Sequence, residues 1–237
     1  MFICGEKKVV VVDDRFPFCK AKNDWAFSRT SAGKEIWVLL LEKAWAKVFG
    51  SYQRIEGGTC DEALHPLTGC PTKNFIHNDC KNKERLWQTI IMADQQNFPM
   101  CTAAASSTED DCNADEMVSA GLVDNHAYSL IGAKEITTES GKPIRLCLLR
   151  NPWGKKEWTG AWSDNSAQWT EHMKAQVPNF LAKNDGCFWI EFEDYVDFFY
   201  ITTICFFKTG YKESQVVDEQ SKGQFGVAKI TLLEDTV

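Results

Sequence analysis

The sequence predicts an α+β fold organised around one long antiparallel β-hairpin. Two apolar runs with strand character, His126–Ile136 and Ile144–Arg150, flank a polar segment, TTESGK, that contains Gly141. This pattern is typical of a hairpin with a longer loop closed through glycine. Earlier in the chain, Glu35–Phe49 repeats its apolar residues at the spacing of one helix face. We therefore expect an antiparallel β-sheet with packed helices, this one among them.

The N-terminal part of the chain predicts one strand and this helix. Four successive valines at 9–12 predict a short buried strand that leads into a turn. Residues 18–32 are mixed in character and predict a loop or a second strand. The helix is followed by Gly50, the residue type that commonly ends helices. We expect its apolar face, which includes Leu41 and Trp45, to lie in the core.

Between this helix and the hairpin, the pattern is interrupted by turn residues. Residues 51–83 predict a loop-rich segment because glycine and proline break any period. Glu84–Asn97 predicts a second helix, and Met100–Ala105 a strand of small residues. An acidic stretch follows at Ser106–Asp115. It lacks the alternating ligands and the glycine of an EF-hand, so we interpret it as a solvated loop.

Beyond the hairpin, the sequence predicts a helix and further strands. Asn165–Lys183 carries large apolar residues along one side of a predicted helix. Cys187–Phe192 and Tyr200–Phe207 predict paired strands that close the sheet. From residue 209 the composition becomes polar, and Phe225–Leu233 predicts a last strand.

Composition excludes several classes of protein. The 237 residues carry a net charge of −7 and no basic run, which argues against a nucleic-acid surface. No stretch approaches 18 consecutive apolar residues, so we expect no membrane span. Charges interrupt the N-terminus where a signal peptide needs its apolar core. These features predict a soluble, cytoplasmic protein.

The ten cysteines are scattered and are expected to be reduced in that compartment. A zinc module is one alternative, built on the residues Cys60, His65, Cys70, His77 and Cys80. Their gaps do not match the short cysteine pairs of structural zinc sites. We therefore expect no zinc and interpret these thiols as incidental to a loop.

The hairpin also brings two polar residues together. Folded about its turn, it places His126 opposite the stretch that begins at Asn151, and neighbours across antiparallel strands lie about 5 to 8 Å apart. A histidine held by a carboxamide oxygen is the base half of a Cys-His-Asn hydrolase. The structural alternatives are a histidine satisfied by one hydrogen bond and an asparagine in a turn before proline.

The same residues carry a resemblance to a known family. The matching strings are VVDDR at 11–15, WVLLLEKAWAK at 37–47, HAYS at 126–129, RNPWG at 150–154, EWTGAWSD at 157–164 and DGCFWI at 185–190. In order and spacing they resemble the C-terminal half of a calpain-type, papain-like cysteine protease core. The resemblance covers residues 5–208 and implies the second subdomain of that fold. Residues 209–237 are then a polar linker and the possible start of a C2-like β-sandwich.

The resemblance implies an intracellular, calcium-dependent cysteine endopeptidase that acts on protein substrates. His126 becomes the general base, Asn151 its orienting group and Trp153 a shield over their hydrogen bond, with core packing as the alternative for Trp153. Papain-like nucleophiles occupy a Gly-x-Cys-Trp helix start, and no cysteine here is followed by tryptophan. We therefore expect this chain to supply only the His/Asn half, to need the missing N-terminal subdomain in cis or in trans, and to be inactive alone. The alternative is a non-catalytic calpain homologue that acts as an interaction or regulatory module.

A calcium loop is also implied by the resemblance. Its carboxylates correspond to Glu157, Asp164 and Asp185, whereas Cys187 stands where the family often has a further carboxylate. A thiol is a poor ligand for a hard cation. We expect a weakened calcium site, with surface acids on turns as the alternative.

Overall fold

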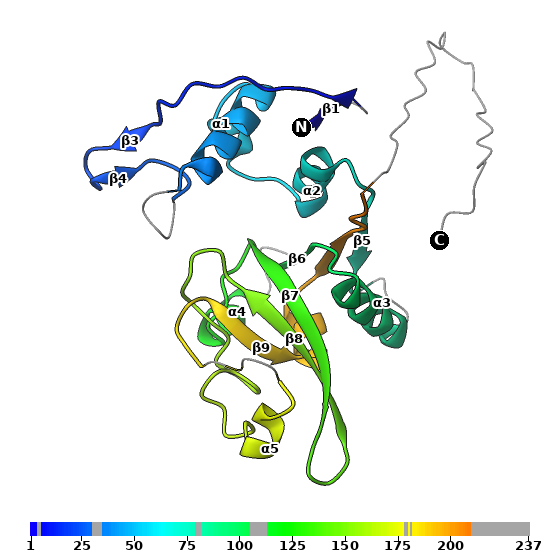
Figure 1. Cartoon of the computed structure of the whole chain (residues 1–237). Coiled ribbons are helices and arrows are strands. Elements are labelled where there is room, and N and C mark those ends of the chain that lie inside the picture. The colour runs from blue at the N-terminus through cyan, green and yellow to red at the C-terminus, as the bar shows by residue number, and fades with distance from the viewer. Residues whose placement is uncertain are drawn as a thin grey trace, which may run out of the picture.

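The centre of the molecule is a six-stranded antiparallel sheet (Figure 1) with the strand order β5-β10-β6-β7-β8-β9. The computed structural model describes residues 1–3, 6–29, 35–78, 82–104, 113–177, 180 and 182–209. The strands of the sheet are β5 (Thr72–Ile76), β6 (Met100–Ala104), β7 (His126–Thr137), β8 (Pro143–Arg150), β9 (Cys187–Glu191) and β10 (Ile201–Cys205). The predicted α+β class is confirmed.

The predicted hairpin is present as β7 and β8. Its loop is closed by backbone hydrogen bonds from the Thr138 amide to the Lys142 carbonyl and from the Gly141 amide to the Thr138 carbonyl. Gly141 has φ +85°, a left-handed conformation that glycine adopts without steric cost. The pairing contains a β-bulge between Leu130 and Gly132, which shifts the register of everything beyond it.

The described residues also form helices. They are α1 (Trp37–Phe49), α2 (Cys60–Thr68), α3 (Lys83–Gln95), α4 (Asn113–Ser119), α5 (Glu171–Lys174) and α6 (Phe192–Phe198), with one 3₁₀ turn, η1 (Gln53–Ile55). The predicted second helix is confirmed as α3, which packs on β7 and buries Leu86, Trp87 and Ile90. Two-residue strands form the pairs β1 (Phe2–Ile3) with β2 (Glu6–Lys7) and β3 (Phe18–Cys19) with β4 (Asp24–Trp25).

Two clusters of buried residues hold these elements together. The larger one joins α3, α4 and α6 to one face of the sheet and contains Trp87, Tyr128, Phe188 and Tyr195. The smaller one lies where the long hairpin meets the segment after β8, and it contains Trp162, Trp169, Met173 and Val177. The site described below lies outside both, at the end of the hairpin that is opposite its turn.

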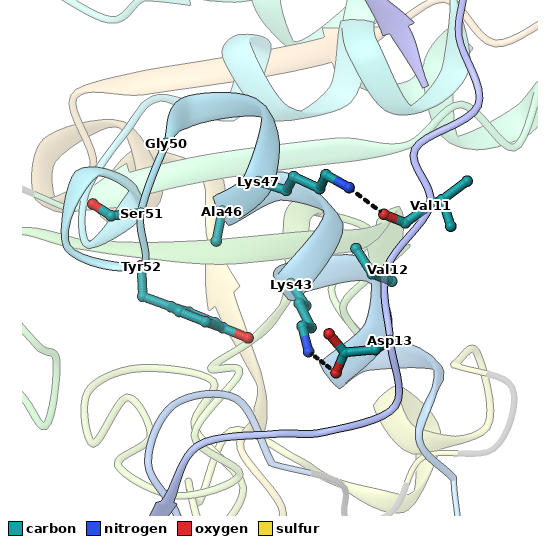
Figure 2. A pocket seen from close by; sticks show the side chains of 9 residues that line it. All are labelled: Val11, Val12, Asp13, Lys43, Ala46, Lys47, Gly50, Ser51 and Tyr52. Carbon is teal, nitrogen blue, oxygen red and sulfur yellow. Dashed lines mark hydrogen bonds and ion pairs between the residues drawn. The ribbon is translucent and has the colours of Figure 1, made fainter.

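The prediction of a buried strand at the four valines is wrong. Val9 is 90% exposed and Val11 is 71% exposed, and the described chain from 8 to 17 contains no strand. Figure 2 shows the reason: Lys47 and Lys43 of α1 reach this segment and bind the Val11 carbonyl and the Asp13 carboxylate. Lysine ammonium groups, rather than a neighbouring strand, therefore bind these two polar groups of the segment. Between them and Tyr52 lies an open hollow of about 630 Å³.

The helix α1 forms as predicted and ends at Gly50 with φ +99°, but it does not pack on the sheet. Its buried residues Leu39, Ala44 and Ala46 belong to neither cluster. Figure 1 shows α1 apart from the sheet, beside the N-terminal segment, and it packs on η1. Leu41 and Trp45 are only half-buried, so the prediction that they are core residues is wrong.

Three further predictions need correction. The segment 51–83 is not mainly loop, because it contains α2 and β5; a capping box of Thr59 and Glu62 starts α2 in spite of the proline inside it. In the described part of the segment 165–183 the only helix is the single turn α5, although large apolar residues of the segment are buried as expected. The two late strands do not pair with each other: β9 pairs with β8 at one edge, while β10 lies between β5 and β6.

Parts of two predictions lie outside the described residues. They are residues 106–112 of the acidic stretch Ser106–Asp115, whose last three residues, 113–115, begin α4, and the polar tail with its predicted last strand from 210 onward. No described helix is long and apolar enough to cross a bilayer.

Candidate active site

The predicted contact between His126 and Asn151 is present. The Nε2 atom of His126 lies 3.0 Å from the Oδ1 atom of Asn151. His126 is the first residue of β7, and Asn151 follows the last residue of β8, so the two elements of one hairpin position both side chains. His126 is half-buried, whereas Asn151 is fully buried.

Backbone groups fix the orientation of the Asn151 amide. The Trp153 N–H donates to Oδ1 at 3.0 Å, and Nδ2 donates to the Lys156 carbonyl at 3.1 Å. A backbone N–H only donates and a carbonyl only accepts, so the oxygen must face His126. The Nε2 atom of His126 therefore carries a proton and donates it to Asn151. Its Nδ1 atom makes no hydrogen bond to any described residue, which leaves a lone pair available to accept a proton.

The β-bulge decides which face of the hairpin Asn151 occupies. Near the turn the register pairs Ile136 with Ile144, and beyond the bulge it pairs Ser129 with Arg150. Continued by one residue, this register sets Asn151 opposite Tyr128, on the same face as His126. Without the bulge, Asn151 would stand opposite Ser129 and point to the other face, because a shift of one residue exchanges the faces of a strand.

Gly186, directly before β9, allows the loop that carries Asn151 to lie close against the turn before that strand. The Asn151 N–H donates to the Gly186 carbonyl at 2.7 Å. Gly186 has φ +89°, and a Cβ atom built on it would lie 2.6 Å from the Asn151 carbonyl oxygen and 2.9 Å from the Gly154 Cα. Both contacts are with backbone, which cannot move away as a flexible side chain can. The turn before β9 thus holds the Asn151 loop in place.

Aromatic rings flank the imidazole on two sides. The Trp153 ring lies 4.4 Å from the His126 ring between centroids, and the Tyr128 ring 5.0 Å away in an edge-on arrangement. Tyr128 is buried, and its hydroxyl accepts a hydrogen bond from the Val123 N–H at 2.8 Å. Trp153 is 53% exposed, which excludes the alternative that it simply packs in the core. Its ring contacts the imidazole and is also open to solvent.

His126 faces open space toward α1 and α2. A hollow of about 550 Å³ beside it is lined by Trp45 and Phe49 of α1 and by the Gly57–Gly58 segment. A second hollow, of about 100 Å³, is lined by both His126 and Cys60. The imidazole is thus held by an amide and lines a space that can receive another group. Such an arrangement suits proton transfer to and from a nucleophile or leaving group.

The cysteines that precede His126 lie in elements that the sequence did not predict for all of them. Cys60 was predicted to lie in a loop, yet it is the first residue of α2. The missed signal is the Thr-x-x-Glu capping box at 59–62. Cys101 is half-buried in β6, and Cys70 is buried. Cys4, Cys80 and Cys112 lie outside the described residues.

The histidines of the zinc alternative have other partners. The His65 Nδ1 atom lies 2.9 Å from the Cys70 carbonyl oxygen. His77 is buried between the Phe199 carbonyl and the Thr202 hydroxyl. Nowhere in the described ranges do three histidine, cysteine or acidic side chains come together as metal ligands.

The three predicted calcium ligands are close enough for their charges to interact, but they are not gathered into one metal site in the described structure, and each is bound to the backbone. The Glu157, Asp164 and Asp185 carboxylates accept hydrogen bonds from the N–H groups of Gly186 at 2.6 Å, Lys183 at 2.7 Å and Cys187 at 3.0 Å. Burial, with a smaller contribution from the charges of Glu157 and Asp185, raises the pKa of Asp164 to about 6. Burial and the Asp185 carboxylate raise the pKa of Cys187 to about 11, so this thiol stays protonated at neutral pH. The oxygens have the chemistry that calcium prefers, whereas the thiol does not.

Comparisons with known proteins relate the chain to one family. The family model of the calpain family cysteine proteases matches residues 1–206. Calpain clp-1 of Caenorhabditis elegans is 39% identical over 200 residues, which cover 83% of this chain and 24% of that protein. The calpain-1 catalytic subunit of Homo sapiens is 37% identical over 203 residues, covering 85% of this chain and 27% of its own.

A plant relative is similar to most of the chain as well. The calpain-type cysteine protease ADL1 of Oryza sativa subsp. japonica is 34% identical over 212 residues, or 86% of this chain and 9% of that protein. The chain therefore spans about a quarter or less of the length of these relatives.

Proposed function

The chain belongs to the calpain family of cysteine proteases, and we propose that it contributes the His/Asn half of a cysteine endopeptidase site. The observation that supports this most directly is the 3.0 Å contact between His126 Nε2 and the fixed Oδ1 of Asn151. It leaves the Nδ1 atom of the imidazole as the base. A thiol nucleophile from a segment outside this sequence, in cis or in trans, would face that atom.

In this proposal each residue has one role in acyl transfer. His126 takes the proton of the nucleophilic thiol through Nδ1 and later returns a proton to the departing amine. Asn151 keeps the imidazole in the tautomer that makes this possible and stabilises the imidazolium that forms. Trp153 limits the access of water to the His126–Asn151 hydrogen bond, which strengthens it. The substrate is a protein, since the chemistry is peptide cleavage, and we place the reaction inside the cell.

Calcium dependence belongs to the proposal in a weakened form. Glu157, Asp164 and Asp185 would hold the ion, and a cation would relieve their mutual repulsion, which adds to the larger effect of burial in raising the pKa of Asp164. Calcium takes six to eight oxygen ligands, whereas these side chains are already bound to backbone amides and Cys187 adds no hard donor. We therefore propose weak binding.

The test is complementation. The chain alone should not cleave a casein substrate, with or without calcium. Addition of a polypeptide that carries a Gly-x-Cys-Trp helix start, either fused upstream or separate, should produce cleavage, and His126→Ala should abolish it. His172→Ala is a matched control, because that histidine is exposed and its Nε2 atom contacts the Thr137 carbonyl, at the end of β7 opposite His126.

The outcomes separate the proposal from its rivals. Complementation that gives a stable complex without cleavage would favour a non-catalytic homologue that serves as an interaction module. Cleavage by the isolated chain, after removal of contaminating proteases, would contradict the need for a second segment. Cys60 would then be the first residue to substitute, because it shares a hollow with His126 and starts a helix.

A further inference from the structure

Two cysteines that are 41 positions apart in sequence meet beneath α2. This helix packs on β10 and β5, with Cys60 as its first residue. Cys101 in β6 pairs with Thr203 of β10, and Thr203 pairs in turn with Asn74 of β5. Thr203 lines the same small hollow as Cys60, and the Asp61 carboxylate binds Asn74. The start of α2 is therefore fixed directly over the sheet face that carries Cys101.

The two thiols interact with each other and have opposite acidities. The Cys101 thiol hydrogen-bonds to the Cys60 sulfur, and this contact lowers the pKa of Cys60 in spite of its partial burial. The same contact, together with burial, raises the pKa of Cys101. The first turn of a helix also favours a negative sulfur. One sulfur of the pair is thus suited to be a nucleophile, and the other holds its proton.

We propose that Cys60 and Cys101 form an oxidisable dithiol, which a peroxide converts into a disulfide that ties α2 to β6. Hydrogen peroxide is the simplest oxidant of this class. The small hollow that Cys60 lines gives it access to this thiol. The pair would form whether or not His126 acts in catalysis.

The reaction balances in two steps. The Cys60 thiolate attacks one peroxide oxygen, the O–O bond breaks, and the products are a Cys60 sulfenic acid and hydroxide, which takes up the proton that Cys60 had released. The Cys101 sulfur then attacks the Cys60 sulfur and displaces the hydroxyl group, which leaves with the Cys101 proton as water. Two thiols become one disulfide, and one peroxide becomes two waters.

Other cysteines in the described part of the chain lack this combination. Cys205 contacts the Thr68 hydroxyl, and the buried Cys70 donates to the carbonyls of Thr68 and Lys208. Cys187 is accessible to a similar degree as Cys60, but its pKa is raised to about 11. Cys187 therefore provides a matched control for a half-buried thiol without a thiolate.

The test uses the full chain, reduced and then treated with hydrogen peroxide. Remaining thiols are alkylated, and the peptides are identified by mass spectrometry. We expect a cross-linked peptide that joins Cys60 to Cys101 and disappears on reduction. Cys60→Ser should abolish it and leave Cys101 alkylated, while Cys187→Ser should leave it intact. In the Cys101→Ser variant, oxidation of Cys60 should stop at the sulfenic acid, which dimedone should trap.

A thermal measurement checks that the bond forms in the folded protein. The oxidised wild-type chain should unfold at a higher temperature than the reduced chain, and this shift should vanish in Cys60→Ser and Cys101→Ser. Circular dichroism of the reduced variants establishes that they fold. Oxidation of Cys187 or Cys19 ahead of Cys60, or a disulfide between Cys60 and any other cysteine, would overturn the proposal.

Discussion

The imidazole of His126 and the carboxamide of Asn151 meet at 3.0 Å across the open end of one hairpin, although 25 residues separate them. Three hydrogen bonds converge on the buried amide, and two of them come from backbone groups of the loop that follows it. Its orientation is therefore independent of the histidine. The amide selects the tautomer of the histidine, and not the reverse.

The first prediction concerns that tautomer. Neutral His126 should carry its proton on Nε2, and Asn151→Ala should convert it to a mixture because the acceptor is gone. The substitution should also cost about 1 to 3 kcal/mol of stability, since buried backbone groups lose their partners. Long-range proton–nitrogen spectra of labelled protein report the tautomer. The His172 signals serve as an internal control, and a wild-type proton on Nδ1 would contradict the assignment.

The second prediction compares two glycines of similar conformation. Gly141 and Gly186 have φ +85° and φ +89°, so alanine meets similar backbone strain at both, roughly 1 to 2 kcal/mol. A Cβ atom at Gly141 meets no atom within 4 Å, whereas at Gly186 it meets the Asn151 carbonyl at 2.6 Å. Gly186→Ala should therefore be clearly more destabilising in urea unfolding, and it alone should disturb the His126 tautomer. Equal losses of stability would show that the close approach is unimportant.

The third prediction follows from the buried His77. Burial lowers the pKa of His77 to about 4, from an ordinary value of 6.5. The folded state thus prefers the neutral ring, in which Nδ1 donates to the Phe199 carbonyl and Nε2 accepts from Thr202. Its contribution to stability is complete above pH 6.5 and is lost as the pH falls toward 4. The resulting loss of folding stability is at most about 3 kcal/mol.

The measurement is the unfolding free energy as a function of pH for the wild-type chain and for His77→Gln, which should lose less stability over this window. Asp164 acts in the opposite direction, because its raised pKa means that protonation near pH 6 favours the folded state. Asp164→Asn should therefore steepen the loss of stability on acidification. Parallel curves for wild type and His77→Gln would contradict the assignment to His77.

The fourth prediction places the main core at α3 rather than at α1. Trp87 is 1% exposed and packs on Phe192 with 5.2 Å between ring centroids, so Trp87→Ala should cost about 3 to 5 kcal/mol. Trp45→Ala should cost much less, because Trp45 is half-buried and its ring contact is the exposed Phe49. Urea unfolding of the two variants measures both losses of stability. A larger loss for Trp45 would mean that α1 carries the greater part of the core.

The fifth prediction concerns calcium. Titration calorimetry should show weak binding or none near Glu157, Asp164 and Asp185, for the reasons given above. Cys187→Asp should strengthen binding, since it replaces a thiol with a hard oxygen donor. A micromolar site in the wild-type chain that Asp185→Ala abolishes would show that carbonyl oxygens and water complete the coordination.

Local patterns in the sequence determined the hairpin, its Gly141 loop, the helices α1 and α3, and the approach of His126 to the region of Asn151. Periodicity and turn chemistry act over a few residues, so these features need no knowledge of distant contacts. Even α2 had a local signal in its capping box, although the proline inside the helix masked it.

Only the tertiary structure decided what surrounds those elements. The apolar character of the valines at 9–12 could not show that lysines of α1, rather than a strand, would meet their backbone. Strand order could not be read either, because β10 inserts between β5 and β6 through contacts more than 90 residues apart. The pairing of Cys60 with Cys101 depends on that order. The face of Asn151 depends on the bulge between Leu130 and Gly132, where one extra residue turns the side chain toward His126 instead of away from it.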